Sequence, residues 1–216
     1  MRGRVGLFAG GQGGGAAVSA VAAYVGPDVV TVADVDARER EIRAGGREHS
    51  LPRPGTSEAR QLRRWLTQVL VAERVVAATD GADGHVPTEA ELLPDAVARM
   101  EIGSIAASTL ADPHGRAVFA AVTADVEISD DEVTAYHARN PDRFAKAEGG
   151  VGGWRRAVAA PELEVVWVDI SAHLLAAARR RRYRRWLDAR CAELVTLADG
   201  FEHPGDPRQP DNTHRH

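Results

Sequence analysis

Residues 125–145 read Asp-Val-Glu-Ile-Ser-Asp-Asp-Glu-Val-Thr-Ala-Tyr-His-Ala-Arg-Asn-Pro-Asp-Arg-Phe-Ala. Ser129 and Glu132 have the spacing of a capping box, in which each side chain accepts a hydrogen bond from the backbone amide of the other residue. Apolar residues follow at helical spacing. Asn140-Pro141 ends the helix, because the residue before a proline is pushed out of the α region. The stretch therefore predicts a short helix with a firm start and a sharp end.

Similar signals along the rest of the chain predict a mainly α protein. Residues 19–31 predict a short β-hairpin that turns at Gly26-Pro27-Asp28. Thr31 and Asp34 predict the cap of a helix that ends at Gly45-Gly46. Further helices are predicted at about 57–78, 88–110 with a break at Pro94, 116–124, and 169–199.

The last predicted helix carries apolar residues at spacings of three or four, a stripe that a single helix cannot bury. We therefore expect this long C-terminal helix to pack back on the N-terminal helices. The stripe consists of Tyr183, Leu187, Cys191, Leu194 and Ala198.

Composition limits the classes of function. The chain has 216 residues, a hydrophobic fraction of 44% that can form a core, and a formal net charge of −4. The arginines at 179–185 wrap around the helix, so we interpret them as a solvated face with acidic partners and expect no nucleic acid as a partner. Cys191 is the only cysteine, which excludes an intramolecular disulfide and a cysteine-based zinc site.

The first residues leave two alternatives for localisation. Residues 1–23 carry early arginines and small apolar residues, like a signal peptide, but a run of glycines at 10–15 interrupts them. We expect a cytoplasmic protein, with export as the alternative if residues 1–23 act as a signal peptide. No segment has the roughly 20 apolar residues that a membrane span needs.

Three stretches resemble chaperones of the SurA/PrsA parvulin type. Ile-Ser-Asp-x-Glu-Val-x-x-Tyr with Asn-Pro-Asp-x-Phe, from residue 128, is similar to the entry to their parvulin domain. Val-Thr-Val-Ala-Asp-Val-Asp at 30–36 and Leu-Arg-Arg-Trp-Leu-Thr-Gln-Val-Leu-Val-Ala-Glu at 62–73 resemble their N-terminal region. The resemblance covers about residues 20–145 and 165–199.

The resemblance implies a domain order in which the isomerase is lost. A parvulin domain of roughly a hundred residues would stand where this chain has a short Gly-, Ala- and Pro-rich linker. The implied order is a Gly-rich segment at 1–18, a SurA-like helical module at 19–145, a linker at 146–164, a C-terminal helix at 165–200 that packs back on the module, and a Pro/His-rich tail at 201–216.

The resemblance also implies a function: a peptide-binding chaperone-like protein without prolyl-isomerase activity. It would bind unfolded or extended polypeptide in an apolar groove between helices, non-covalently and without a cofactor. The residues expected to contact the peptide are Trp65, Leu66, Val69, Tyr136, Tyr183 and Trp186.

The alternative is an accessory enzyme, or a small-molecule or metal-binding protein of specialised, polyketide-type metabolism. His203, His214 and His216 in the tail could hold a divalent transition metal, since imidazole suits zinc, copper and nickel. The rival expectation for the tail is a docked strap, because its prolines pre-set an extended path and Phe201 supplies an apolar anchor.

Two short stretches resemble acyl-carrier-protein malonyltransferases. Residues 8–13 resemble their opening Phe-Pro-Gly-Gln-Gly, and residues 48–52 resemble their nucleophile motif Gly-His-Ser-x-Gly. A nucleophile elbow needs glycines around the serine so that the turn can be sharp. Glu48 and Pro52 occupy those two positions, so we expect Ser50 to have no catalytic role.

Overall fold

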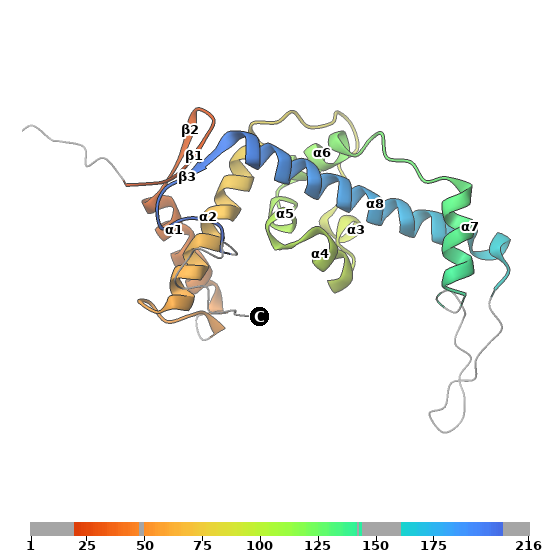
Figure 1. The fold of residues 1–216 in the computed structure, drawn as a ribbon, viewed down its shortest axis with the longest axis horizontal. Coiled ribbons are helices and arrows are strands. Elements are labelled where there is room, and N and C mark those ends of the chain that lie inside the picture. Colours follow the sequence, from red (N-terminus) through yellow and green to blue (C-terminus); the bar gives the residue numbers. More distant parts are fainter. Residues whose placement is uncertain (1–19, 48–49, 142, 144–160, 205–216) are drawn as a thin grey trace, which may run out of the picture.

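The computed structural model describes residues 20–47, 50–141, 143 and 161–204. These residues confirm a mainly α structure, with a small sheet at one end and a long C-terminal helix that starts at the opposite end and runs to the sheet (Figure 1). No helix among the described residues is long and apolar enough to cross a membrane. The segment at 1–18, most of the linker at 146–164, and tail residues 205–216 lie outside the described part of the chain.

The predicted hairpin is confirmed. β1 (Val21–Val25) and β2 (Asp28–Thr31) are antiparallel and are joined at Gly26-Pro27. Gly26 has a φ of +56°, in the left-handed region that glycine adopts without a steric penalty. A third strand, β3 (Val195–Leu197), pairs antiparallel with the other edge of β1, so the strand order is β2-β1-β3.

The long C-terminal helix is also present, but its predicted bounds are wrong. α8 (Leu163–Leu194) begins before the predicted start at Asp169 and ends before the predicted end at Asp199. Residues 195–197 form β3 instead, and the Ala198 amide donates to the carbonyl of Ala22 at 3.0 Å. β-branched residues favour a strand here, and pairing satisfies the edge of β1, which a longer helix would leave open.

The predicted capping box of Ser129 and Glu132 and the predicted cap formed by Thr31 and Asp34 are confirmed. α7 (Asp130–Arg139) starts with the Glu132 amide donating to Ser129 Oγ at 3.3 Å and the Ser129 amide donating to Glu132 Oε2 at 2.9 Å. The same reciprocal pair begins α1 (Val32–Ile42) and α3 (Glu89–Leu92). These three helix starts are therefore fixed by residues three apart in the sequence.

α2 (Ser57–Ala77) matches the predicted helix and packs against α1, α5 (Ser104–Thr109), α6 (Pro113–Val122) and α8. α1 ends a little earlier than Gly45-Gly46, and a π-helical turn, Arg43–Arg47, follows it. The helix predicted over 88–110 is divided twice in the structure.

Pro94 divides that helix, as predicted, and α4 (Ala96–Ile102) begins after an Asp95 cap. Gly103, with a φ of +85°, makes a second break that the sequence analysis did not predict, and α5 (Ser104–Thr109) follows it. The chain therefore makes short helices that turn around the long ones.

α6 (Pro113–Val122) begins before the predicted start at Arg116, because Asp112 caps it and Pro113 occupies its first turn. Gly115 lets α6 approach α5 closely: a Cβ atom there would lie 1.9 Å from the carbonyl oxygen of Thr109. A side chain at this position would force the two helices apart.

α8 packs back on the N-terminal helices, as its stripe predicts. Tyr183 and Leu187 are buried, and the Tyr183 ring lies 5.1 Å from that of Phe119 between ring centroids. The Tyr183 hydroxyl also shares a 2.8 Å hydrogen bond with the hydroxyl of Thr109. We call this cluster the body core; its largest buried members include Leu66, Val71, Val75, Ile102, Leu110, Val118, Tyr183 and Leu187.

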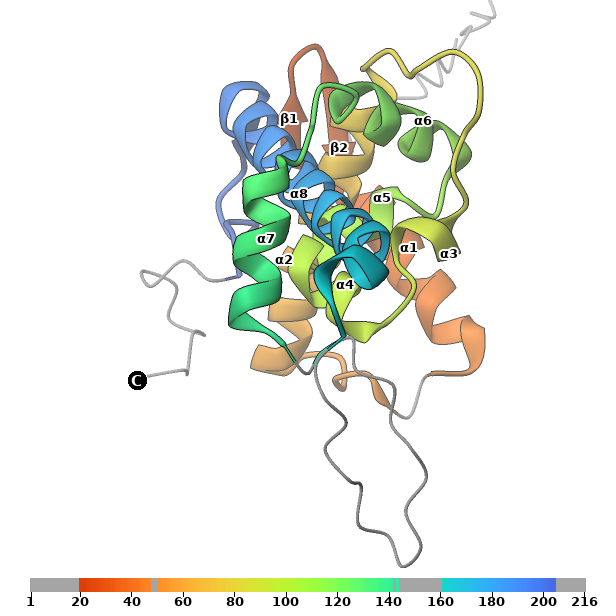
Figure 2. The same ribbon diagram turned by 90° about the vertical axis from the view of Figure 1, so that its right-hand side faces the viewer.

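A second, separate cluster joins α7 to the N-terminal half of α8. Its buried residues are Val133, Val166 and Ile170, and the ring of Tyr136 packs beside them. We call it the outer cluster. Figures 1 and 2 show α7 lying against α8 at the end far from the sheet.

Candidate functional site

The six residues predicted to contact peptide do not meet on one surface. Leu66 and Tyr183 are fully buried in the body core, and Val69 is 2% exposed. Trp65 and Trp186 pack at the edge of that core, whereas Tyr136 belongs to the outer cluster. None of the six lines any of the three clefts described below.

The predicted metal ligands are only partly within the described residues. His203 is exposed and lines a cleft of about 410 Å³ beside Gly103, Arg184 and Cys191. His214 and His216 lie outside the described part, so the structure does not bring the three histidines together or separate them. Within the described ranges, no group of three His, Cys, Asp or Glu side chains is placed to hold a metal ion.

The structure supports no catalytic role for the other two candidates from the sequence, Cys191 and Ser50. Burial raises the pKa of the Cys191 thiol to about 11, so this residue is a neutral, inert thiol at neutral pH. Ser50 lies in the loop before α2, while Glu48, His49 and the stretch at 8–13 lie outside the described residues.

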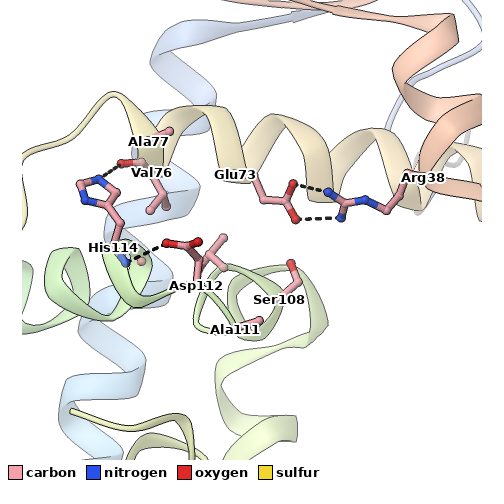
Figure 3. A pocket seen from close by; sticks show the side chains of 10 residues that line it. Arg38, Glu73, Val76, Ala77, Ser108, Ala111, Asp112 and His114 are labelled. Carbon is pink, nitrogen blue, oxygen red and sulfur yellow. Dashed lines mark hydrogen bonds and ion pairs between the residues drawn. The ribbon is translucent and has the colours of Figure 1, made fainter. Parts of the chain in front are cut away.

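A cleft of about 420 Å³ lies where α1, α2, α5 and α6 meet, and we call it the polar cleft after the charged side chains in its lining. Figure 3 shows Arg38 and Glu73 joined on one side by two hydrogen bonds of 2.8 and 2.7 Å. On the other side, the ring Nε2 of His114 lies 3.3 Å from the carbonyl oxygen of Val76. The carboxylate of Asp112 caps α6 by accepting from the His114 amide at 2.7 Å.

The polar groups of this cleft are largely used within the protein. The Ser108 hydroxyl donates to the carbonyl of Ile105 at 2.7 Å. Among the described residues, no hydrogen bond joins the His114 ring to the side chain of Ser108 or Asp112. The cleft therefore lacks the hydrogen-bonded nucleophile and base that acyl transfer through serine requires.

A larger groove, of about 550 Å³, lies between α3, α6 and α8. We call it the apolar groove. Small side chains from α6 and α8 face each other across it and leave space between the helices, and Phe119 from the body core lines it. Its main apolar residues are Leu92, Phe119, Ala120, Ala172, Leu175 and Ala176.

The charged groups of the apolar groove differ in what they already bind. Arg180 donates to Glu101 Oε2 at 2.7 and 3.0 Å, and Glu91 closes the capping box of α3. Hydrogen bonds from the backbone and hydroxyl of Thr88 lower the pKa of Glu91. The Nε atom of Arg179, in contrast, is buried without a hydrogen-bond partner among the described residues.

The groove continues outward as an exposed apolar face of α8. Ala172 and Leu175 line the groove, and Val168 and Val165 continue the same face with exposed fractions of 70% and 76%. The stripe predicted for this helix, from Tyr183 to Ala198, did not include this face. The spacing of three and four residues from Val165 would have identified it.

Comparisons with known proteins add little to the geometry. Residues 21–58 match a family of unknown function, DUF7158. This stretch contains the hairpin, α1 and the start of α2, and contributes no residue to the apolar groove. No curated protein and no solved structure matches the chain.

Proposed function

We propose that the protein binds polypeptide segments non-covalently in the apolar groove between α3, α6 and α8. The observation that carries the proposal is the continuity between this groove and the exposed Val165–Val168 face of α8. Exposed apolar surface next to a concave, apolar site is typical of surfaces that bind other molecules. Together they offer a path long enough for several side chains of one segment.

The proposal agrees with the function that the SurA/PrsA resemblance implies, but it uses different residues. Leu66, Val69 and Tyr183 are buried, and the proposed contact surface is formed by α8 and α6. Binding of this kind needs no cofactor. We also propose that the protein lacks prolyl-isomerase activity, and turnover above background in a protease-coupled assay would contradict this.

A fluorescence anisotropy titration tests the site. The probe is fluorescein-labelled, carboxymethylated α-lactalbumin, a permanently unfolded polypeptide. Ala172→Trp places an indole in the groove and should weaken binding about tenfold, roughly 1.4 kcal/mol. Ala189→Trp is the matched control, because Ala189 is also exposed on α8 but lines none of the three clefts.

The control should bind as the wild type does, and circular dichroism should show both variants folded. Equal affinity for the wild type and the two variants would place binding elsewhere. No binding by the wild-type protein would contradict the proposed function itself.

The polar cleft is the place for the alternative function, a small-molecule site. Its Arg38, Asp112 and His114 side chains could bind a polar ligand, and a metal at the tail histidines would be a further proposal. Elemental analysis of the purified protein tests the metal directly, since a stoichiometric transition metal would favour this alternative.

A further inference from the structure

The residues of α8 that line the groove and continue its face outward follow a coiled-coil repeat. Val165, Val168, Ala172, Leu175 and Arg179 are separated by three, four, three and four residues. In an α-helix this spacing places side chains on one narrow stripe, the seam with which one helix packs along another. We call it the α8 seam.

α7 does not cover the α8 seam. The residues of α8 that pack in the outer cluster are Leu163, Val166, Ile170 and Leu174, three or four residues apart. At about 100° per residue, they point to the side of the helix opposite the seam. The outer half of α8 therefore has two apolar faces, one occupied by α7 and one exposed.

The walls of the groove favour a helical occupant over an extended one. An extended segment gains most when a sheet edge bonds its backbone. The walls here are mainly helices, whose backbone groups are already bonded internally, with His85 and Pro87 of the loop before α3 at one side, and no strand in the described part of the chain lines the groove. A helix satisfies its own backbone and can pack side chains against the seam. A helix lying in an apolar groove is a common mode of peptide recognition.

Arg179 adds a charge requirement at the inner end of the seam. Arg180 is engaged by Glu101, and Glu91 is engaged by Thr88. The guanidinium of Arg179 is left with a buried, unpartnered Nε atom at the groove wall. This Nε atom is closed to an occupant, but a carboxylate on the occupant would pair with the other nitrogens of the Arg179 guanidinium, which lines the groove, through a charge-assisted hydrogen bond.

We infer that the occupant is an amphipathic α-helix of another protein, which packs along the α8 seam and presents a carboxylate to Arg179. This inference rests on the proposed function and specifies the conformation and charge of the bound segment.

The experiment uses three labelled synthetic peptides in anisotropy titrations. The first forms a helix whose leucines are spaced alternately three and four residues apart, to match the α8 seam, with one glutamate in the turn that would lie next to Arg179. The second replaces that glutamate by glutamine, and the third has the composition of the first in a scrambled order. We expect the first to bind most tightly and to gain helical circular dichroism on mixing.

Arg179→Gln should weaken binding of the glutamate peptide about tenfold and leave the glutamine peptide little changed. Arg185→Gln is the matched control, because Arg185 is exposed on the same helix and lines none of the three clefts. If Arg179→Gln does not fold, Arg179→Lys keeps the charge and tests the geometry of the guanidinium.

Two results would overturn the inference while the proposed function stands. One is equal affinity for the helical and the scrambled peptide. The other is an equal loss of affinity for the glutamate and the glutamine peptide in Arg179→Gln. Binding of unfolded α-lactalbumin in the same assay separates these from failure of the proposed function. Sedimentation velocity gives a third test: self-association that Val168→Asp abolishes would identify a second copy of the chain as the occupant.

Discussion

The inner half of α8 is surrounded by the body of the protein, whereas its outer half is covered by α7 on one side and exposed on the other. Tyr183 and Leu187 contact helices from most of the chain, but Val166 and Ile170 contact a single short helix and its neighbours. The inner half should therefore unfold only with the whole molecule, and the outer half can open locally. The proposed binding surface lies where the two halves meet.

The largest effect should come from a charge in the body core. Leu187→Asp buries an unpaired carboxylate at a position that is 2% exposed and should cost about 4 kcal/mol of unfolding free energy, or prevent folding. Val168→Asp on the exposed seam should cost less than about 0.5 kcal/mol. Urea denaturation followed by circular dichroism measures both, and an unchanged midpoint for Leu187→Asp would show that α8 is independent of the body.

A cavity in the outer cluster should act locally. Ile170→Ala removes a fully buried side chain and should weaken the α7–α8 contact by about 2–4 kcal/mol. Hydrogen exchange should increase in α7 while α2 stays protected. Ile102→Ala, in the body core, is the matched control and should increase exchange in α2 as well. Parallel changes in α2 for both variants would mean that the two clusters unfold as one unit.

A single hydrogen bond in the body core should have a smaller effect. Tyr183→Phe removes the hydroxyl that bonds Thr109 while the ring stays packed against Phe119. Thr109 keeps its bond to the carbonyl of Ala106, so the cost should be about 1 kcal/mol. Thermal unfolding checks it, and a loss as large as that of a cavity variant would show that the hydroxyl organises the core.

The smallest expected effect is a pH dependence confined to the outer half. Burial lowers the pKa of His173, and the nearby charge of Arg143 lowers it further. Because the folded-state pKa is depressed below 6.5, His173 is neutral in the folded protein at neutral pH and protonates more readily when the protein unfolds. The contribution of His173 to the stability of the outer half should be fully present above pH 6.5 and should be lost as the pH falls below it.

Hydrogen exchange in α7, measured across this range and corrected for intrinsic rates, tests the effect. His173→Gln should remove the pH dependence between pH 7 and about 5, where the capping carboxylates are still ionised. A dependence that persists unchanged in this variant would assign it to another group.

The sequence alone determined the features that depend on neighbouring residues. Ser129 and Glu132 cap α7 because the two partners are three residues apart, and Pro94 breaks its helix because proline lacks an amide hydrogen. The mainly α class, the hairpin and the packing of α8 on the body also follow from local signals and the apolar stripe. These features need no knowledge of distant parts of the chain.

Only the tertiary structure decided where α8 ends and what its surface offers. Residues 195–197 leave the helix because the edge of β1, more than 160 residues away in sequence, provides hydrogen bonds that compete with helical ones. Residue types predicted neither the pairing of Arg180 with Glu101 nor the unpartnered Nε atom of Arg179. Such contacts depend on which segments meet in the folded chain, and the apolar groove is formed by three helices that meet in this way.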